Sequence, residues 1–121
     1  MAASGLSDNG FAPSFWGPGM WQVIHFTAAT FPSKPTAKDR RGYRAFFESL
    51  RHVLPCPGCR AGYETLISSG RLKLTDAVFR DRLTLFRWTT ELHDAVNAKL
   101  GKPTGVDWRR WYAYYDQARS G

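Results

Sequence analysis

The sequence is poor in cysteine and lacks any long apolar run, and each shortage excludes a class of protein. Only two of the 121 residues are cysteines, whereas a secreted domain held together by disulfides would carry several pairs. No apolar run approaches the roughly 20 residues that a membrane-spanning helix needs, so we expect no membrane partner. Residues 1–13 have neither a basic start nor an apolar core, so we expect a disordered tail there and no secretory signal.

Acidic side chains are also scarce compared with basic ones. The 17 Lys and Arg residues outnumber the 10 Asp and Glu residues, which gives a formal net charge of +7. A solvated basic surface explains this charge, but so would an acidic protein partner, an anionic cofactor or a nucleic acid. The basic residues are spread over several predicted helices, and no nucleic-acid-binding signature accompanies them. We therefore expect no nucleic-acid partner.

Helical signals account for the first half of the chain. We expect a first helix over residues 18–30 and a second that begins at a capping box formed by Thr36 and Asp39. Pro55 ends the second helix, and Pro57 suits the first turn of a third. The second helix gathers its apolar side chains on one face: Tyr43, Phe46, Phe47, Leu50, Val53 and Leu54.

The second half of the chain predicts one long helix and one short one. The long helix is expected over residues 75–100, and Asp107 caps the short one. No segment alternates apolar and polar residues as a strand would. The expected fold is therefore all-α, a four-helix bundle with a short fifth helix. We expect one domain over residues 14–118, followed by a short tail at residues 119–121.

The long helix changes character along the stripe that should face inward. Seven residues follow alternating spacings of four and three and share that stripe: Phe79, Leu83, Phe86, Thr90, His93, Asn97 and Leu100. Its second half is polar, and a buried polar group without a partner costs about 1–3 kcal/mol. A hydrogen-bonded core histidine explains His93 alone. His93 and Asn97 together, with Lys99 and Lys102 behind them, favour a bound ligand.

The two cysteines form the pair Cys56-Pro-Gly-Cys59 at the expected start of the third helix. Unpaired N–H groups and the helix dipole favour a thiolate there, and thiol–disulfide exchange requires a thiolate. Zinc sites begin in the same way, but the chain offers only His25, His52 and His93, without the paired spacing of a zinc finger. A thioredoxin-like fold would place the motif after a strand, which the sequence does not predict. We therefore expect a redox pair and no metal.

Three segments together resemble the Erv/ALR family of FAD-linked sulfhydryl oxidases. They are residues 16–21 with His25, residues 54–59, and residues 93–103. The resemblance covers about residues 16–112, and the three segments follow the family's order. In length and in its few cysteines the chain is most similar to the single-domain members that some large DNA viruses encode.

The resemblance implies a bundle that holds FAD at one end, usually as a homodimer. It also implies a set of residues in contact with the cofactor: Gly17, Pro18, Trp21, His25, Tyr63, His93, Asn97, Lys99, Lys102, Trp108 and Trp111. Trp108 and Trp111 compete for the aromatic position that closes over FAD. The residues themselves agree, because aromatic walls, imidazole and amide donors and nearby cations suit a long, flat, anionic ligand. Trp21 and His25 share one face of the first helix, although core packing explains that pair equally well.

The activity implied by the resemblance is the oxidation of dithiols to disulfides. Cys56 would exchange with a dithiol on a substrate protein or redox carrier, and Cys59 would pass the electrons to FAD. Molecular oxygen would accept them, giving hydrogen peroxide. The family pattern is not matched everywhere, since Asp94 stands where many members have asparagine and Thr90 stands where a cysteine would often lie. A second, shuttle cysteine pair is also absent, so a partner must reach Cys56 and Cys59 directly.

The cysteine content also bears on location. The lack of a signal and of structural disulfides favours the cytoplasm, with the host-cell cytoplasm or the virion for a viral protein, over the mitochondrial intermembrane space. Two alternatives to the oxidase stay open. The first is a non-enzymatic basic helical module that binds zinc or nucleic acid. The second keeps the fold and the FAD but has no turnover.

Overall fold

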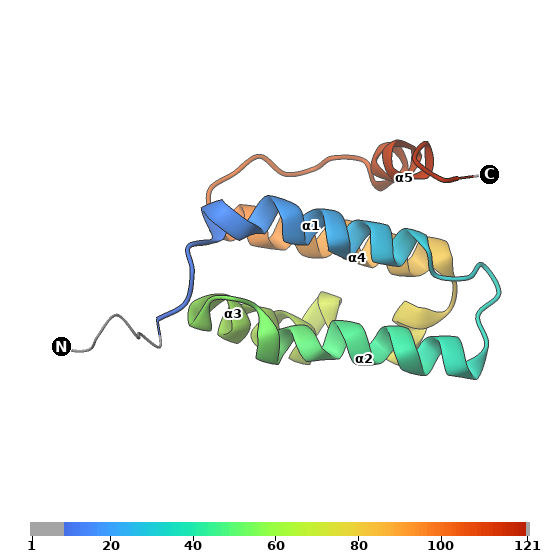
Figure 1. Ribbon diagram of the computed structural model, residues 1–121, viewed down its shortest axis with the longest axis horizontal. Coiled ribbons are helices and arrows are strands. Elements are labelled where there is room, and N and C mark those ends of the chain that lie inside the picture. Colours follow the sequence, from blue (N-terminus) through green and yellow to red (C-terminus); the bar gives the residue numbers. More distant parts are fainter. Residues whose placement is uncertain (1–8, 121) are drawn as a thin grey trace.

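The computed structural model describes residues 9–120, and this part of the chain folds into two layers of helices (Figure 1). One layer consists of α1 (Pro13–Ala29) and α4 (Arg82–Lys99), which pack along each other. The other consists of α2 (Ala37–Val53) and α3 (Pro57–Ser68), and its apolar face meets the first layer. These four helices form the bundle that the sequence predicts.

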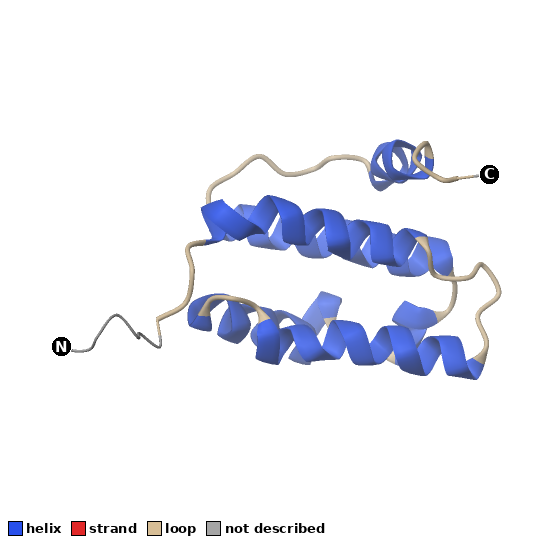
Figure 2. Cartoon of the chain, in the orientation of Figure 1, coloured by secondary structure: helices blue, strands red, loops and turns tan. Residues whose placement is uncertain are grey.

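The remaining elements are short. α5 (Trp108–Asp116) lies on the outer side of the first layer and contacts both α1 and α4. Two 3-10 helices, η1 (Gly70–Leu72) and η2 (Asp76–Phe79), connect α3 to α4. Figure 2 shows no strand between residues 9 and 120, so the all-α prediction is confirmed. None of the helices described here is long and apolar enough to cross a lipid bilayer.

Local capping signals fix three of the helix starts, as the sequence predicts. Thr36 and Asp39 form a capping box, in which Asp39 N donates to Thr36 Oγ1 over 3.1 Å and Thr36 N donates to Asp39 Oδ2 over 2.8 Å. Pro57 occupies the first turn of α3. The Asp107 carboxylate accepts the Arg109 N–H over 3.0 Å at the start of α5.

The first helix begins earlier than predicted, at Pro13 instead of residue 18. Pro13 suits the first helical turn, where its missing N–H leaves no backbone bond unmade. Pro18 lies inside the helix, where it removes one backbone hydrogen bond but stays exposed. Of the predicted N-terminal tail, residues 1–8 lie outside the described part of the chain. Residues 9–12 contact the chain at the start of α3.

The long predicted helix is divided, because α4 begins at Arg82 and not at residue 75. The Phe79 carbonyl accepts the Arg40 Nε–H over 3.1 Å, so a side chain of α2 takes the place of a helical hydrogen bond. Asp81 caps the new start, and its carboxylate accepts the Thr84 N–H over 2.8 Å. A contact between segments far apart in the chain therefore overrides the local helical pattern.

The inward face of α4 also differs from the predicted stripe. Leu83 and Leu100, which lie toward its two ends, are 47% and 58% exposed. An α-helix has about 3.6 residues per turn, so a stripe spaced at about 3.5 drifts around the helix over several turns. The buried residues of α4 are Leu85, Phe86, Trp88, Thr89, Thr90 and Leu92, of which the predicted stripe contains only Phe86 and Thr90. Thr89, which the predicted stripe omits, is thereby turned inward.

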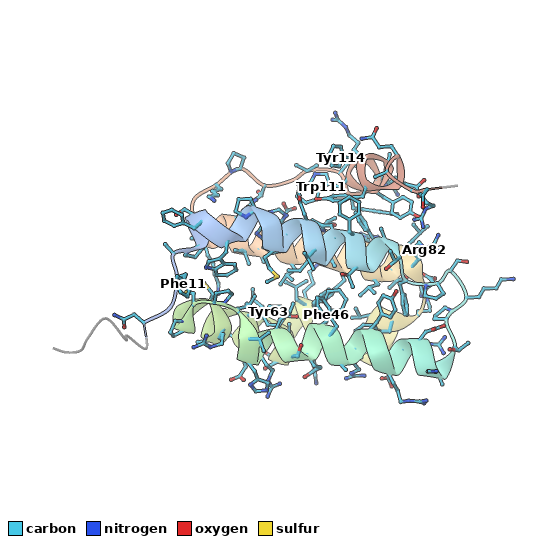
Figure 3. All side chains as sticks on the ribbon, in the orientation of Figure 1. Phe11, Phe46, Tyr63, Arg82, Trp111 and Tyr114 are labelled. Carbon is cyan, nitrogen blue, oxygen red and sulfur yellow. The ribbon has the colours of Figure 1, made fainter. Side chains whose placement is uncertain are left out.

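The core between the two layers is aromatic and aliphatic. Its largest fully buried apolar side chains are Phe31, Phe47, Phe79, Leu85, Phe86 and Leu92. Burial of each stabilises the fold by about 1.5–3 kcal/mol relative to exposure. Tyr63 lies between the layers (Figure 3), and its hydroxyl donates to the Phe47 carbonyl over 2.6 Å. Val53, predicted on the apolar face of α2, is exposed where that helix ends.

Candidate functional site

The two cysteines lie at the turn between α2 and α3, here called the cysteine turn (residues 54–59). Cys56 is the residue that caps the N-terminus of α3, and its Sγ accepts the Cys59 backbone N–H over 3.2 Å. The Arg60 guanidinium donates to the Leu54 carbonyl over 2.6 Å and holds the turn from the other side. Both thiols are free and half-buried. The predicted catalytic pair is therefore adjacent and set at a helix start.

The cysteine turn gives the two thiols different acidities. Hydrogen bonds from the Cys59 thiol and from the Cys59 backbone N–H hold the pKa of Cys56 below its ordinary value, and the charge of Arg60 adds to this. Burial raises the pKa of Cys59 to about 11, and its hydrogen bond to Cys56 adds to the effect. The reduced pair therefore carries its first negative charge on Cys56 and keeps a proton on Cys59. Cys56 is the thiolate that suits exchange with another disulfide or thiol.

The N-terminal segment, residues 9–12, lies against the cysteine turn. The Phe11 N–H donates to the Pro55 carbonyl over 2.6 Å, and the Trp16 indole N–H donates to the Phe11 carbonyl over 2.8 Å. A Cβ added to Gly10 would lie 2.5 Å from Pro55 O and 2.6 Å from Cys56 Cα, so only glycine permits this approach. Figure 3 shows Phe11 beside the start of α3. The sequence gives no periodic signal for such an extended contact, and the prediction of a tail missed it.

A second group of residues, here called the histidine cluster (Trp21, His25, Thr89, His93 and Trp111), joins α1, α4 and α5. His25 Nε2 lies 3.0 Å from His93 Nδ1, and His25 Nδ1 lies 3.0 Å from Thr89 Oγ1. The Trp21 ring stacks on the His93 ring, with centroids 3.8 Å apart and planes 7° from parallel. The Trp111 ring meets both imidazoles edge-on, at centroid distances of 5.0 and 4.9 Å.

Burial keeps both imidazoles of the histidine cluster uncharged. His25 has no exposed surface, and this burial, together with the charge of His93, lowers its pKa from 6.5 to about 3. Burial also lowers the pKa of His93 to about 4; the charge of Asp94 opposes that change, and that of Lys102 adds to it. At neutral pH the cluster is therefore an uncharged group of aromatic rings that keeps the imidazole nitrogens as hydrogen-bonding atoms.

A surface pocket of about 480 Å³ lies beside the histidine cluster. Its lining residues are His93, Val106, Arg110, Trp111, Tyr114 and Tyr115. Figure 3 shows Trp111 and Tyr114 on α5, the helix that supplies most of this lining. Aromatic side chains with one guanidinium suit a flat ligand that carries negative charge. Arg110, Tyr114 and Tyr115 are lining residues that the sequence reasoning missed, because only the packing of α5 on α1 and α4 identifies them.

Three predicted cofactor residues lie at or just after the end of α4: Asn97 and Lys102 on the side of the histidine cluster, and Lys99 on the side of α3. The Asn97 side chain donates to the Pro103 carbonyl over 3.3 Å, and Lys102 N donates to the Asn97 carbonyl over 2.8 Å. These bonds hold the turn after α4. The charge of Lys102 lies close enough to lower the pKa of His93. The Lys99 ammonium instead reaches α3, 3.7 Å from the position of a Cβ at Gly62. Lys99 therefore lies nearer to the helix that carries Cys59.

Four other predicted cofactor residues lie outside the histidine cluster. Gly17 is buried in α1 and Pro18 is exposed on the same helix. Tyr63 belongs to the core through its bond to Phe47. Trp108 lies beneath the guanidinium groups of two arginines, at 5.9 and 5.0 Å from its ring centroid, whereas Trp111 makes ring contacts with both histidines. Of the two tryptophans on α5, Trp111 is therefore the one that joins the cluster.

Three further observations bear on the departures from the family pattern and on the zinc alternative. The Asp94 carboxylate accepts the Gly105 N–H over 3.3 Å and so binds the loop before α5. The Thr90 hydroxyl donates to the Arg87 carbonyl over 2.7 Å, within its own helix. Among residues 9–120, no group of three or more His, Cys, Asp or Glu side chains is placed to hold a metal ion.

Comparisons with known proteins agree with this arrangement. The sequence model of the Erv1 / Alr family matches residues 18–116. A protein of Acanthamoeba polyphaga mimivirus named "Probable FAD-linked sulfhydryl oxidase" is 38% identical over 91 residues, which cover 75% of this chain and 62% of that protein. The mitochondrial FAD-linked sulfhydryl oxidase of Saccharomyces cerevisiae is 31% identical over 87 residues, or 72% of this chain and 43% of that protein. This chain thus spans less than two thirds of either relative.

A solved structure gives the same fold. The crystal structure of the yeast Erv1 core superposes with a TM-score of 0.78 at 24% sequence identity, and the match covers 98% of this chain and 97% of that one. The family match extends over most of the chain and contains the cysteine turn as well as the histidine cluster. The chain therefore belongs to the Erv1 / Alr family.

Proposed function

We propose that the protein is an FAD-dependent sulfhydryl oxidase that converts protein dithiols to disulfides. The observation that carries the proposal is the cysteine turn, where Cys56 caps a helix and has a lowered thiol pKa beside Cys59. The relatives named above are FAD-linked sulfhydryl oxidases by name, which supports the same chemistry here. The alternative of a zinc- or nucleic-acid-binding module has no support among these relatives.

The exchange begins with the pair in its disulfide form. A substrate thiolate attacks Cys56 Sγ, a substrate–Cys56 bond forms, the Cys56–Cys59 bond breaks, and Cys59 leaves as a thiolate. The second substrate thiolate then attacks the substrate sulfur of the mixed disulfide and expels Cys56. Its lowered pKa makes Cys56 the better leaving group in this step. The substrate loses two electrons and two protons. The cysteine pair gains both electrons, one proton goes to Cys59, whose raised pKa favours the thiol, and the other is released to water.

The residues of the histidine cluster fit FAD. A long, flat, anionic cofactor needs aromatic walls and nearby cations, and the pocket beside the cluster offers both in Trp111 and Arg110. His93 and Trp111 would hold its adenine side, with Lys102 and Arg110 near the phosphates. When bound, FAD supplies a two-electron acceptor for the cysteine pair and a donor to molecular oxygen, with hydrogen peroxide as product. The remaining predicted contacts belong to the same proposal: Gly17, Pro18, Trp21, His25, Tyr63, Asn97 and Lys99.

The proposal extends to partners and location. The chain carries a single cysteine pair, so we expect a reduced dithiol protein or carrier to meet Cys56 directly. We expect a homodimer, which sedimentation of the purified protein tests. The mimivirus relative favours the cytoplasm of an infected cell or the virion, whereas the yeast relative is mitochondrial by name. Fractionation of infected or expressing cells, followed by immunodetection, distinguishes these compartments.

An absorption spectrum of the purified chain tests the cofactor and the electron path together. We expect a yellow protein whose flavin bands bleach when dithiothreitol is added without oxygen and return in air. A colourless protein that cannot be reconstituted with FAD would overturn the proposal. A yellow protein that consumes no oxygen with dithiothreitol would instead indicate a flavin-binding scaffold without turnover.

A further inference from the structure

The hydrogen bonds of the histidine cluster have a fixed direction, which begins at Thr89. The Thr89 hydroxyl carries one hydrogen, and its oxygen lies 2.6 Å from the Phe86 carbonyl, which only accepts. Two acceptor oxygens at that distance with no proton between them would repel, so Thr89 donates to Phe86. Its oxygen must then accept at the 3.0 Å contact with His25 Nδ1. His25 therefore carries its ring proton on Nδ1.

The direction continues into the second imidazole. Burial keeps His25 neutral, so a ring protonated at Nδ1 has a lone pair at Nε2. That lone pair lies 3.0 Å from His93 Nδ1, and His93 therefore donates from Nδ1. His93 is neutral as well, which leaves its Nε2 as an acceptor. Within residues 9–120, His93 Nε2 makes no hydrogen bond, and His93 lines the pocket beside α5.

We propose that Thr89 is a positioning residue that sets the tautomers of both histidines, so that His93 offers the ligand an unprotonated Nε2. The inference rests on the proposed function, in which the ligand is FAD, and it specifies the group of the ligand that meets His93. That group is a hydrogen-bond donor, such as an amino or hydroxyl group. The opposite tautomer would offer an N–H to this donor and would lose the bond.

The surroundings keep the chain of hydrogen bonds in place. Thr89 and His25 have no exposed surface, so water does not compete for these bonds. Trp21 stacks on His93, and Trp111 meets both imidazoles edge-on, which restrains rotation of the rings. No sequence pattern singles out Thr89, because its part in the cluster depends on a side chain of α1.

The chain offers a matched control for Thr89 in the next residue. Thr90 is also buried, lies on the same helix and donates to a carbonyl three residues back, but within residues 9–120 its hydroxyl makes no hydrogen bond to either histidine. Thr89→Val and Thr90→Val therefore remove the same hydroxyl from similar surroundings. Only the first variant interrupts the chain of hydrogen bonds. Thr89→Ser keeps the hydroxyl and should restore the wild-type behaviour.

The test measures the tautomers directly, by nitrogen-15 NMR of the histidine rings in the full chain with and without FAD. We expect wild-type His25 and His93 to be protonated at Nδ1, with Thr90→Val and Thr89→Ser unchanged. Thr89→Val should give mixed tautomers and an FAD dissociation constant about tenfold higher, the usual effect of one lost hydrogen bond. Protonation at Nε2 in the wild type would overturn the proposal, even if Thr89→Val fails to fold.

A second outcome separates this inference from the proposed function. If Thr89→Val changes the tautomers but binds FAD as the wild type does, then the assignment of the ligand's donor is wrong. If no variant and no wild-type sample binds FAD, the proposed function fails, whereas the tautomers remain measurable in the free protein. Unchanged tautomers in Thr89→Val would show that Thr89 does not set them.

Discussion

The cysteine turn and the histidine cluster use opposite physical means to control their titratable groups. The turn leaves its thiols half-buried at a helix start, where the Cys59 thiol and then backbone N–H groups favour a negative charge on Cys56. The cluster buries His25 and His93 among aromatic rings, which favours the uncharged imidazoles. One chain therefore keeps a cysteine that favours the thiolate and two uncharged imidazoles on different helices. Loss of a thiol from the cysteine turn should therefore leave the histidine cluster intact.

The largest expected effect comes from removing one thiol, which should abolish the activity of the cysteine turn without changing the histidine cluster. Cys59→Ala should reduce dithiol oxidation to the uncatalysed background, because Cys56 alone cannot form the internal disulfide. FAD should stay bound, since the histidine cluster is unchanged. Oxygen consumption with dithiothreitol and the visible spectrum measure the two results. Ser68→Ala, at the other end of α3, is the control and should alter neither; loss of FAD from Cys59→Ala would contradict the separation.

Acid should weaken the histidine cluster before it affects the rest of the fold. Below pH 6.5 the unfolded chain binds a proton at each histidine, whereas His93 and His25 in the folded chain resist protonation down to about pH 4 and about pH 3. The unfolded state then binds more protons, so stability falls as the pH falls. His25 contributes about 1.4 kcal/mol per pH unit over this window, and His93, which is partly exposed to solvent, contributes less.

Urea unfolding between pH 8 and pH 4.5 measures this loss. The stability should be level above pH 6.5 and should decline below it. The lowered pKa values of Asp39 and Asp81 lie on the acid side of 3.8, so these carboxylates contribute little in this window. His25→Gln combined with His93→Gln should flatten the decline. An equal slope in that double variant would show that other groups cause it.

The tryptophans of α5 sharpen the boundary of the histidine cluster. Trp111 contacts both imidazoles, whereas Trp108 packs under arginine side chains. Aromatic contacts contribute about 0.5–1.5 kcal/mol each, so Trp111→Ala should raise the FAD dissociation constant about tenfold. Trp108→Ala should raise it by less than about twofold on the same scale. Fluorescence titration with FAD measures both dissociation constants. Equal effects would indicate that FAD contacts both tryptophans of α5.

Local signals in the sequence were sufficient for most of the fold. The capping box at Thr36 and Asp39, the proline at residue 57 and the Asp107 cap each act within one helical turn, and each is found as predicted. The split of the long helix was not predictable in this way. The Phe79 carbonyl at the split accepts a hydrogen bond from the Arg40 side chain, a contact that exists only because α2 packs against this segment.

The candidate site shows the same limit. The spacing of the two cysteines and the position of His93 one turn from Asn97 are visible in the sequence. The sequence does not predict that Thr89 faces inward, because a 3.5-residue stripe places Thr90 there. In the structure both threonines are buried. The sequence does not predict the role of Gly10 either, since the Pro55 carbonyl that it approaches lies far away along the chain. Contacts between distant segments decide these roles.

The smallest expected effect tests how far residues 9–12 shield the Cys56 thiol from solvent. Residues 9–12 cover part of that turn, and Gly10→Ala would place a Cβ 2.6 Å from Cys56 Cα. The segment must then move away, so alkylation of Cys56 by iodoacetamide should become a few times faster, and stability should fall by about 1 kcal/mol with the lost hydrogen bond. Gly19→Ala, where nothing lies within 4 Å, is the matched control. An unchanged alkylation rate in Gly10→Ala would mean that the segment does not screen Cys56, and that substrates approach this thiol from another side.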